Sequence, residues 1–126
     1  ITVHKEYQEN LPHVEAYGGQ LNQVFMNILD NAAFAIKEKG DAWIRLKSDG
    51  QNAIIEFEDN GCGMNETTRK KVFDPFFTTK EVGQGTGLGM AISYKVIKNH
   101  KGRIELESQE GKGSKFTIIL PLKMSK

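Results

Sequence analysis

Apolar side chains recur at intervals of three and four residues in the first third of the chain. They are Leu21, Val24, Phe25, Ile28, Leu29, Ala32 and Ile36. This spacing puts them on one helical face, so the pattern predicts an amphipathic helix that begins at Leu21 and ends near Gly40. A second helix is expected from about Leu88 to Asn99, and a short one from Asn65 or Glu66.

Alternating and β-branched stretches predict strands at both ends and in the middle of the chain. Asp49 and Gly50 separate two of them, and this dipeptide is typical of a tight hairpin. The segment QEGKG separates the last two. The expected strands are residues 1–7, 42–48, 53–59, 102–108 and 114–121, with a short edge piece after Pro12.

This order of elements predicts an α+β fold. We expect a two-layer α/β sandwich, in which helices cover one face of a single mixed, mostly antiparallel sheet. The 126 residues fit one domain, residues 1–126. The covered sheet face is expected to consist of Ile44, Leu46, Ile104, Leu106, Phe116, Ile118 and Leu120.

Composition excludes several classes of protein. The formal net charge of +1 comes from interspersed charges, which argues against a nucleic-acid partner and against membrane contact through a polybasic patch. The basic clusters at 69–71 and 98–101 are interpreted as solvated faces. Cys62 is the single cysteine, which excludes an internal disulfide and favours a reducing compartment. The chain starts at Ile1 without an initiator methionine, and we expect it to be a piece of a longer protein.

Two asparagines interrupt the first helical pattern. Asn27 and Asn31 are four residues apart, so they lie on one side of the helix at the margin of its apolar stripe. They are either a boundary pair bonded to neighbouring loops or two amide oxygens aimed at a hard cation such as Mg²⁺.

Asp59 ends a strand on its apolar side, after Ile55 and Phe57. A carboxylate in that position is costly unless it is hydrogen-bonded. It either caps the following turn or accepts a hydrogen bond from a ligand that Gly61 and Gly63 allow to approach.

Alternate glycines precede the last helix, at Gly83, Gly85, Gly87 and Gly89. Such a segment is either a hinge or a phosphate cradle, because free backbone N–H groups and a helix N-terminus attract anions. FFTTK lies just upstream, which makes a mobile lid with Lys80 at its tip plausible.

Four of these segments together resemble the ATP-binding catalytic domain of bacterial sensor histidine kinases, in the superfamily of gyrase, Hsp90 and MutL ATPases. They are similar to the N box (NQVFMNILDNAAFAI), the G1 box (DNGCGM), the F box (FDPFFTTK) and the G2 box (GQGTGLG), in the family's order. The resemblance covers essentially the whole chain. It implies a Bergerat-type ATP-binding fold, the cofactors ATP and Mg²⁺, and transfer of the γ-phosphoryl group to a histidine.

The resemblance also implies roles for individual residues. Asn31 would hold Mg²⁺, Asn27 would assist it, and both would act in catalysis together with Lys80. Asp59 would accept a hydrogen bond from the adenine amino group, in a pocket shaped by Gly61 and Gly63. The phosphate cradle would consist of Gly83, Gly85, Thr86, Gly87, Leu88 and Gly89.

The chain departs from related proteins at two positions, the first of which concerns the ATP-hydrolysing relatives. They carry a water-activating glutamate where this chain has Asn27, so transfer to a protein side chain is favoured over hydrolysis. Many family members also carry a phosphate-binding lysine where Phe34 stands here. Two alternatives stay open, a gyrase-type ATPase and a nucleotide-sensing interaction module without catalysis.

None of His4, His13 and His100 stands in the sequence context of an acceptor histidine. The resemblance therefore implies a histidine-bearing dimerisation domain of the same protein as partner, and indirectly a response regulator receiver domain. We expect this chain to be monomeric and cytoplasmic, whether or not its parent protein is anchored in a membrane.

Overall fold

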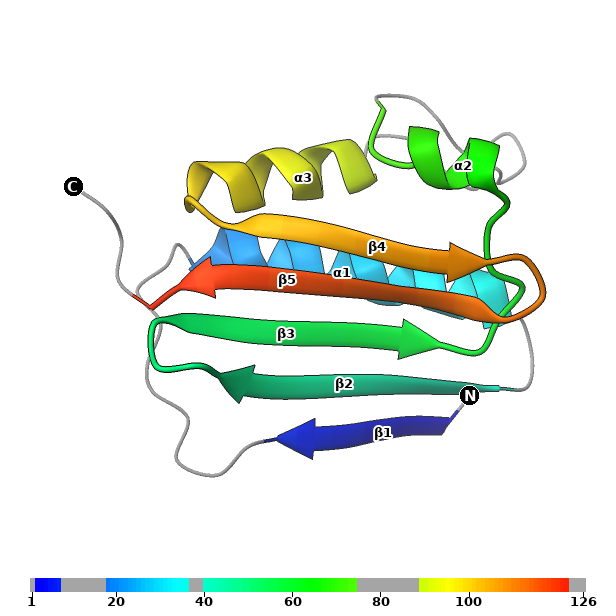
Figure 1. The fold of residues 1–126 in the computed structure, drawn as a ribbon, viewed down its shortest axis with the longest axis horizontal. Helices are drawn as coiled ribbons and strands as arrows, with labels where there is room; N and C mark the ends of the chain where they lie inside the picture. The colour runs from blue at the N-terminus through cyan, green and yellow to red at the C-terminus, as the bar shows by residue number, and fades with distance from the viewer. Residues whose placement is uncertain (1, 8–17, 37–39, 75–88, 123–126) are drawn as a thin grey trace.

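The computed structural model describes residues 2–7, 18–36, 40–74 and 89–122, which form a sheet covered on one face by helices (Figure 1). The sheet has five strands in the order β1-β2-β3-β5-β4. In chain order the elements are β1 (Thr2–Tyr7), α1 (Gly18–Ile36), β2 (Asp41–Ser48), β3 (Asn52–Asp59), α2 (Glu66–Lys71), α3 (Gly89–Asn99), β4 (Arg103–Gln109) and β5 (Gly113–Pro121).

The sheet is mixed, as the sequence predicts. Strand β1 runs parallel to β2, while the β2–β3, β3–β5 and β4–β5 pairs are antiparallel. The predicted hairpin at Asp49 and Gly50 is confirmed: Gly50 has a φ of 94°, and Asp49 Oδ1 accepts the backbone N–H groups of Gln51 and Asn52.

Burial alternates along β3, so that Ala53, Ile55, Phe57 and Asp59 face the helices. The register places Ile55 opposite Ile118 and Phe57 opposite Phe116, which joins the inward residues of adjacent strands. The residues expected on the covered face are all buried or packed against the core, so this prediction is confirmed.

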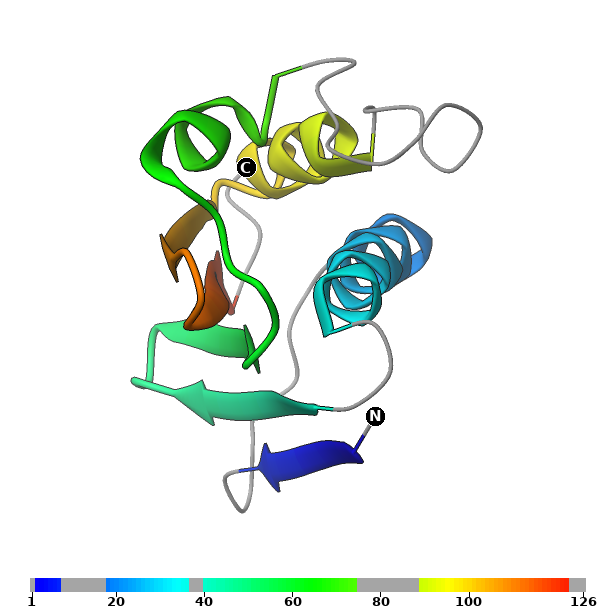
Figure 2. The ribbon, with the colours of Figure 1, turned by 90° about the vertical axis from the view of Figure 1, so that its right-hand side faces the viewer.

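Helices α1 and α3 lie side by side over the sheet, and α2 lies close to β4 (Figures 1 and 2). Helix α1 begins at Gly18, three residues before the predicted start, and the predicted start of α3 at Leu88 lies outside the described residues. Helix α2 begins after Asn65, whose side chain accepts the Thr68 N–H group. None of the described helices has the length and apolarity that crossing a membrane would require.

The opposite face of the sheet carries ion pairs. Arg45 bridges Glu6 on β1 and Glu58 on β3, with N–O distances of 2.7 and 2.6 Å. Lys115 on β5 lies within 3.7 Å of carboxylate oxygens of both Glu56 and Glu107. These oppositely charged side chains therefore pair with one another across neighbouring strands.

Truncation of Ile97 tests the position of the core. This α3 side chain is 0% exposed, so Ile97→Ala should lower the free energy of unfolding by about 2–5 kcal/mol through lost burial and a residual cavity. The matched control is Ile92→Ala on the same helix, because Ile92 is 38% exposed and should cost about 1 kcal/mol or less. Urea denaturation measures both, and equal losses would contradict the described packing.

Candidate functional site

Asn27 joins α1 to the first turn of α3. Its Nδ2 donates to the Gly89 carbonyl oxygen at 3.0 Å and to Ser93 Oγ at 3.2 Å. Both Asn27 and Asn31 are partly buried, as expected at the margin of the apolar stripe. The amide of Asn31 has no hydrogen-bonding partner among the described residues. Both side chains therefore keep an amide oxygen that a ligand can use.

Asp59 is buried, with 6% of its surface exposed at the end of β3. Its Oδ1 accepts the Gly61 N–H group at 2.9 Å, so it does cap the following turn. Burial raises the pKa of this carboxyl above 3.8, and the nearby Glu58 adds to the rise, although backbone hydrogen bonds from Gly61 and Ser114 oppose it. A carboxylate offers about four acceptor positions. Two backbone bonds leave room for a further donor.

The turn after Asp59 rests directly on other backbone segments. A Cβ atom at Gly61 would lie 2.7 Å from the carbonyl of Ala35 on α1, and Cys62 donates its N–H to that same oxygen. Gly63 has a φ of 69°, and a Cβ atom there would lie 2.1 Å from the Gln109 oxygen. The structure thus gives these glycines a packing reason in addition to the predicted one, because they let the turn lie against α1 and the β4–β5 hairpin.

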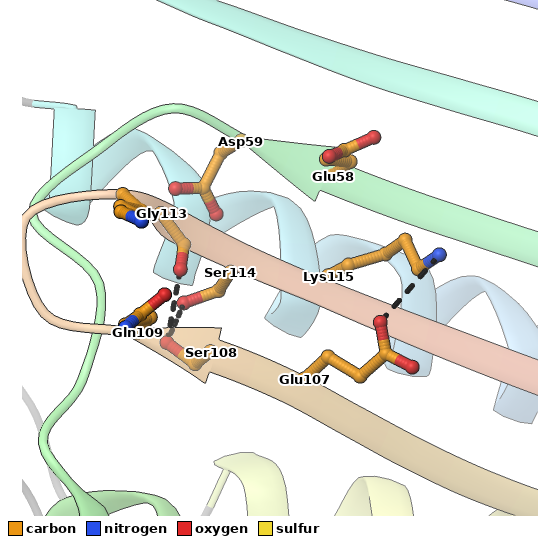
Figure 3. A pocket seen from close by; sticks show the side chains of 9 residues that line it. Glu58, Asp59, Glu107, Ser108, Gln109, Gly113, Ser114 and Lys115 are labelled. Carbon is orange, nitrogen blue, oxygen red and sulfur yellow. Dashed lines mark hydrogen bonds and ion pairs between the residues drawn. The ribbon is translucent and has the colours of Figure 1, made fainter.

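Two serines that sequence reasoning passed over complete the surroundings of Asp59. Ser108 Oγ accepts the Met64 N–H group at 2.8 Å. It also lies 2.8 Å from Ser114 Oγ (Figure 3). Ser114 is buried and pairs with Asp59 across the β3–β5 ladder. A signal was present, because Ser108 and Ser114 occupy the inward phase of strands whose other inward residues are apolar.

Helix α1 contacts both parts of this arrangement. Asn27 bonds to the start of α3, and the Ala35 carbonyl accepts a hydrogen bond from the turn after Asp59. Eight residues separate these contacts, which is about 12 Å along a helix at 1.5 Å per residue. Helix α1 therefore sets the spacing between the turn that follows Asp59 and the Asn27 amide.

The remaining predicted residues lie outside the described residues. They are Lys80, Gly83, Gly85, Thr86, Gly87 and Leu88. Gly89, the last of the predicted phosphate cradle, is the first residue of α3.

A hollow of roughly 390 Å³ opens beside the ends of β3, β4 and β5 (Figure 3). It shares Asp59 with the candidate site, but neither Asn27 nor Asn31 lines it. Lys115 and Glu107 on its wall pair at 3.7 Å, so their charges largely cancel. The residues that line it are Glu58, Asp59, Glu107, Ser108, Gln109, Lys112, Gly113, Ser114 and Lys115. We therefore centre the candidate site on α1 rather than on this hollow.

The amide oxygens on α1 are suited to a cation that is also bound by phosphate oxygens. No cluster of three or more His, Cys, Asp or Glu side chains able to hold a metal occurs within the described residues. The amide oxygens of Asn27 and Asn31 are hard ligands of the kind Mg²⁺ accepts alongside substrate phosphates and water. These residues fit Mg²⁺ carried by a nucleotide.

Comparisons with known proteins point to one family. The model described as "Histidine kinase-, DNA gyrase B-, and HSP90-like ATPase" matches residues 17–124. The signal transduction histidine-protein kinase AtoS of Escherichia coli (strain K12) is 46% identical over 119 residues, covering 93% of this chain and 19% of AtoS. The chain thus spans about a fifth of the length of this curated relative.

Solved structures of histidine kinases are also similar to this chain. The catalytic domain of histidine kinase ThkA matches with a TM-score of 0.85 and 31% identity, over 97% of this chain and 80% of that one. Full-length ShkA in complex with AMPPNP matches with a TM-score of 0.85 and 25% identity, over 98% of this chain and 26% of that one. Both likenesses extend over nearly all of this chain.

Replacement of Asp59 tests the effect of its burial on stability. The pKa of Asp59 is raised above 3.8 in the folded state, so folding is favoured most when the group is protonated. Stability is therefore lost as pH rises from below 3.8 through the raised pKa. Asp59→Asn should match its parent at low pH and become more stable than the parent as pH rises toward 7, in urea denaturation measured from about pH 3 to pH 7.

The matched control is Asp49→Asn, for which the change of stability with pH should have the opposite sign. Backbone N–H bonds from Gln51 and Asn52 lower the pKa of Asp49, so its stabilising contribution is present above 3.8 and disappears as pH falls through the lowered pKa. Asp49→Asn should accordingly be less stable than its parent only at higher pH. A pH-independent difference for Asp59→Asn would contradict the raised pKa.

Proposed function

Because the chain belongs to the family of histidine kinase-, DNA gyrase B- and HSP90-like ATPases, we propose that it is the ATP-binding catalytic domain of a sensor histidine kinase. In this proposal it binds Mg·ATP and donates the γ-phosphoryl group to a histidine on a separate dimerisation domain of the same protein. One observation carries it: α1 contacts the turn after the buried Asp59 through the Ala35 carbonyl oxygen, and it carries the Asn27 amide eight residues earlier, about 12 Å along the helix. A buried acceptor for a polar base and amide oxygens for a phosphate-bound cation thus lie along one helix.

Asp59 is proposed to bind the adenine amino group. Its carboxylate is buried and retains acceptor capacity after the bonds from Gly61 and Ser114. Adenine presents an N–H donor at the position where guanine presents a carbonyl oxygen. The buried acceptor therefore selects adenine over guanine, because guanine would leave two acceptors facing each other.

Asn31 and Asn27 are proposed to serve the phosphate end. The chemistry that Mg²⁺ would supply there is neutralisation of phosphate charge. Asn31 would supply an amide oxygen to the ion, with Asn27 beside it. The N-terminus of α3 begins at Gly89, within hydrogen-bonding distance of Asn27, and carries roughly half a positive charge that favours an anion.

Asn27 also supports a protein side chain over water as the proposed phosphoryl acceptor. An amide cannot take a proton from water at neutral pH, and both of its N–H groups are already committed to α3. Without a general base at this position, in-line positioning supports transfer to a protein side chain better than hydrolysis.

The acceptor is proposed to lie on another domain. His4 stacks on Trp43 and pairs with Asp41 at 2.9 Å, and His100 is only 3% exposed with Nδ1 against the Val96 carbonyl oxygen. His13 lies outside the described residues. We therefore propose the dimerisation domain as direct partner, a response regulator receiver domain as indirect partner, and a monomeric state for this chain alone.

Transfer of label tests the proposed reaction. The domain is incubated with γ-labelled Mg·ATP, alone and with a separate histidine-bearing dimerisation domain. We expect acid-labile label on the added domain only, because none of His4, His13 and His100 stands in the sequence context of an acceptor histidine. Release of free phosphate by this chain alone would instead indicate a gyrase-type ATPase. The absence of both labelled protein and nucleotide binding would indicate an interaction module.

Removal of the Asp59 carboxylate tests the adenine assignment. Asp59→Ala should weaken ATP and ADP binding about 5- to 150-fold in calorimetry, the effect of about 1–3 kcal/mol from an unpaired buried group. Asp49→Ala is the matched control, since Asp49 lies in the β2–β3 turn at the far end of β3. Equal affinity of the parent for ATP and GTP would contradict the assignment.

A further inference from the structure

The geometry points to Ser93 as a positioning residue that sets which atom of the Asn27 amide faces the nucleotide. This inference rests on the proposed function. Ser93 lies on α3 and is 0% exposed, and its Oγ is 3.2 Å from Asn27 Nδ2. Asn27 lies 62 residues before Gly89 and 66 residues before Ser93 in the sequence, so only the fold brings these residues together.

The chemistry of the contact leaves one orientation for the amide. Ser93 Oγ donates its single proton to the Gly89 carbonyl oxygen at 2.8 Å, four residues earlier in the helix. Its lone pairs therefore face Asn27 and require a donor. The Gly89 oxygen, 3.0 Å from the same Asn27 atom, is also an acceptor only.

A flipped amide would place Asn27 Oδ1 against the Gly89 oxygen and lose that hydrogen bond, and Ser93 could bond to Oδ1 only by withdrawing its proton from the Gly89 oxygen. With the nitrogen held by α3, Oδ1 is the atom left for a ligand. An amide oxygen can bind a cation or a metal-bound water, whereas an amide N–H group cannot. Ser93 thus makes Asn27 an acceptor on the phosphate side without touching the nucleotide itself.

The same contact couples the amide to the position of α3. Gly89 is the first described residue after the glycine-rich segment, and its carbonyl oxygen receives both the Asn27 and the Ser93 bonds. A Cβ atom at Gly89 would lie 3.4 to 3.7 Å from the Asn27 amide atoms, so the two groups are in van der Waals contact. Displacement of this first turn would therefore rotate or release the amide.

The test compares Ser93→Ala with its parent in two measurements on the whole chain. In NMR spectra of the ¹⁵N-labelled protein, the Asn27 side-chain NH₂ signals, assigned with Asn27→Ala, should shift and exchange faster with solvent in Ser93→Ala. In calorimetry, the gain in AMPPNP affinity from Mg²⁺ over EDTA should fall about 2- to 10-fold, the scale of one hydrogen bond. Affinity in EDTA should change less than about 2-fold by the same reasoning.

A double-mutant cycle separates positioning from packing. Ser93→Ala should have no further effect on the Mg²⁺-dependent gain in an Asn27→Ala background, whereas a packing role would give the same loss in both backgrounds. Ser48→Ala is the matched control, because Ser48 accepts a backbone N–H group from Gly50 in the distant β2–β3 turn. Ser93→Cys, with a weak donor and acceptor, should give an intermediate loss.

Unchanged Asn27 NH₂ signals in Ser93→Ala would overturn the inference, whatever the nucleotide result. An additive loss in the Asn27→Ala background would overturn it as well. Failure of the parent to bind AMPPNP in a Mg²⁺-dependent way would count against the proposed function instead. The two ideas therefore fail in distinguishable ways.

Discussion

Burial of one face of α1 against the sheet is the interaction on which the rest of the structure depends. Val24 is 0% and Ile28 1% exposed, and both belong to the same core as Ile55 and Phe57 of β3. A helix anchored along this stripe cannot rotate without exposing it. The asparagines at the margin of the stripe and the Ala35 carbonyl near its end are therefore held at set heights above the sheet.

The two ends of the candidate site are stabilised in different ways. At the Asp59 end, short polar contacts and close backbone packing hold a carboxyl whose pKa burial raises. Such an arrangement costs stability when the carboxyl is ionised. At the Asn27 end, an uncharged amide bonds to a helix terminus and carries no comparable penalty.

The face of the sheet opposite the helices carries charged side chains that pair with one another. Arg45, Glu6 and Glu58 pair on a partly solvated surface, where ion pairs contribute little to stability. Their mutual pairing leaves that face without an unbalanced cluster among the residues described.

The order of the elements, the mixed sheet and the inward position of Asp59 could be predicted from the sequence alone, because the period of the apolar residues differs between helix and strand and reports burial directly. It also identified the family, through boxes whose residues are near neighbours in the chain. Local patterns do not encode which distant segments meet. Three such contacts became visible only in the folded chain, because they join segments up to 66 residues apart. They are the register that sets Ser114 beside Asp59, the packing of Gly61 on Ala35, and the bonds from Asn27 to Gly89 and Ser93.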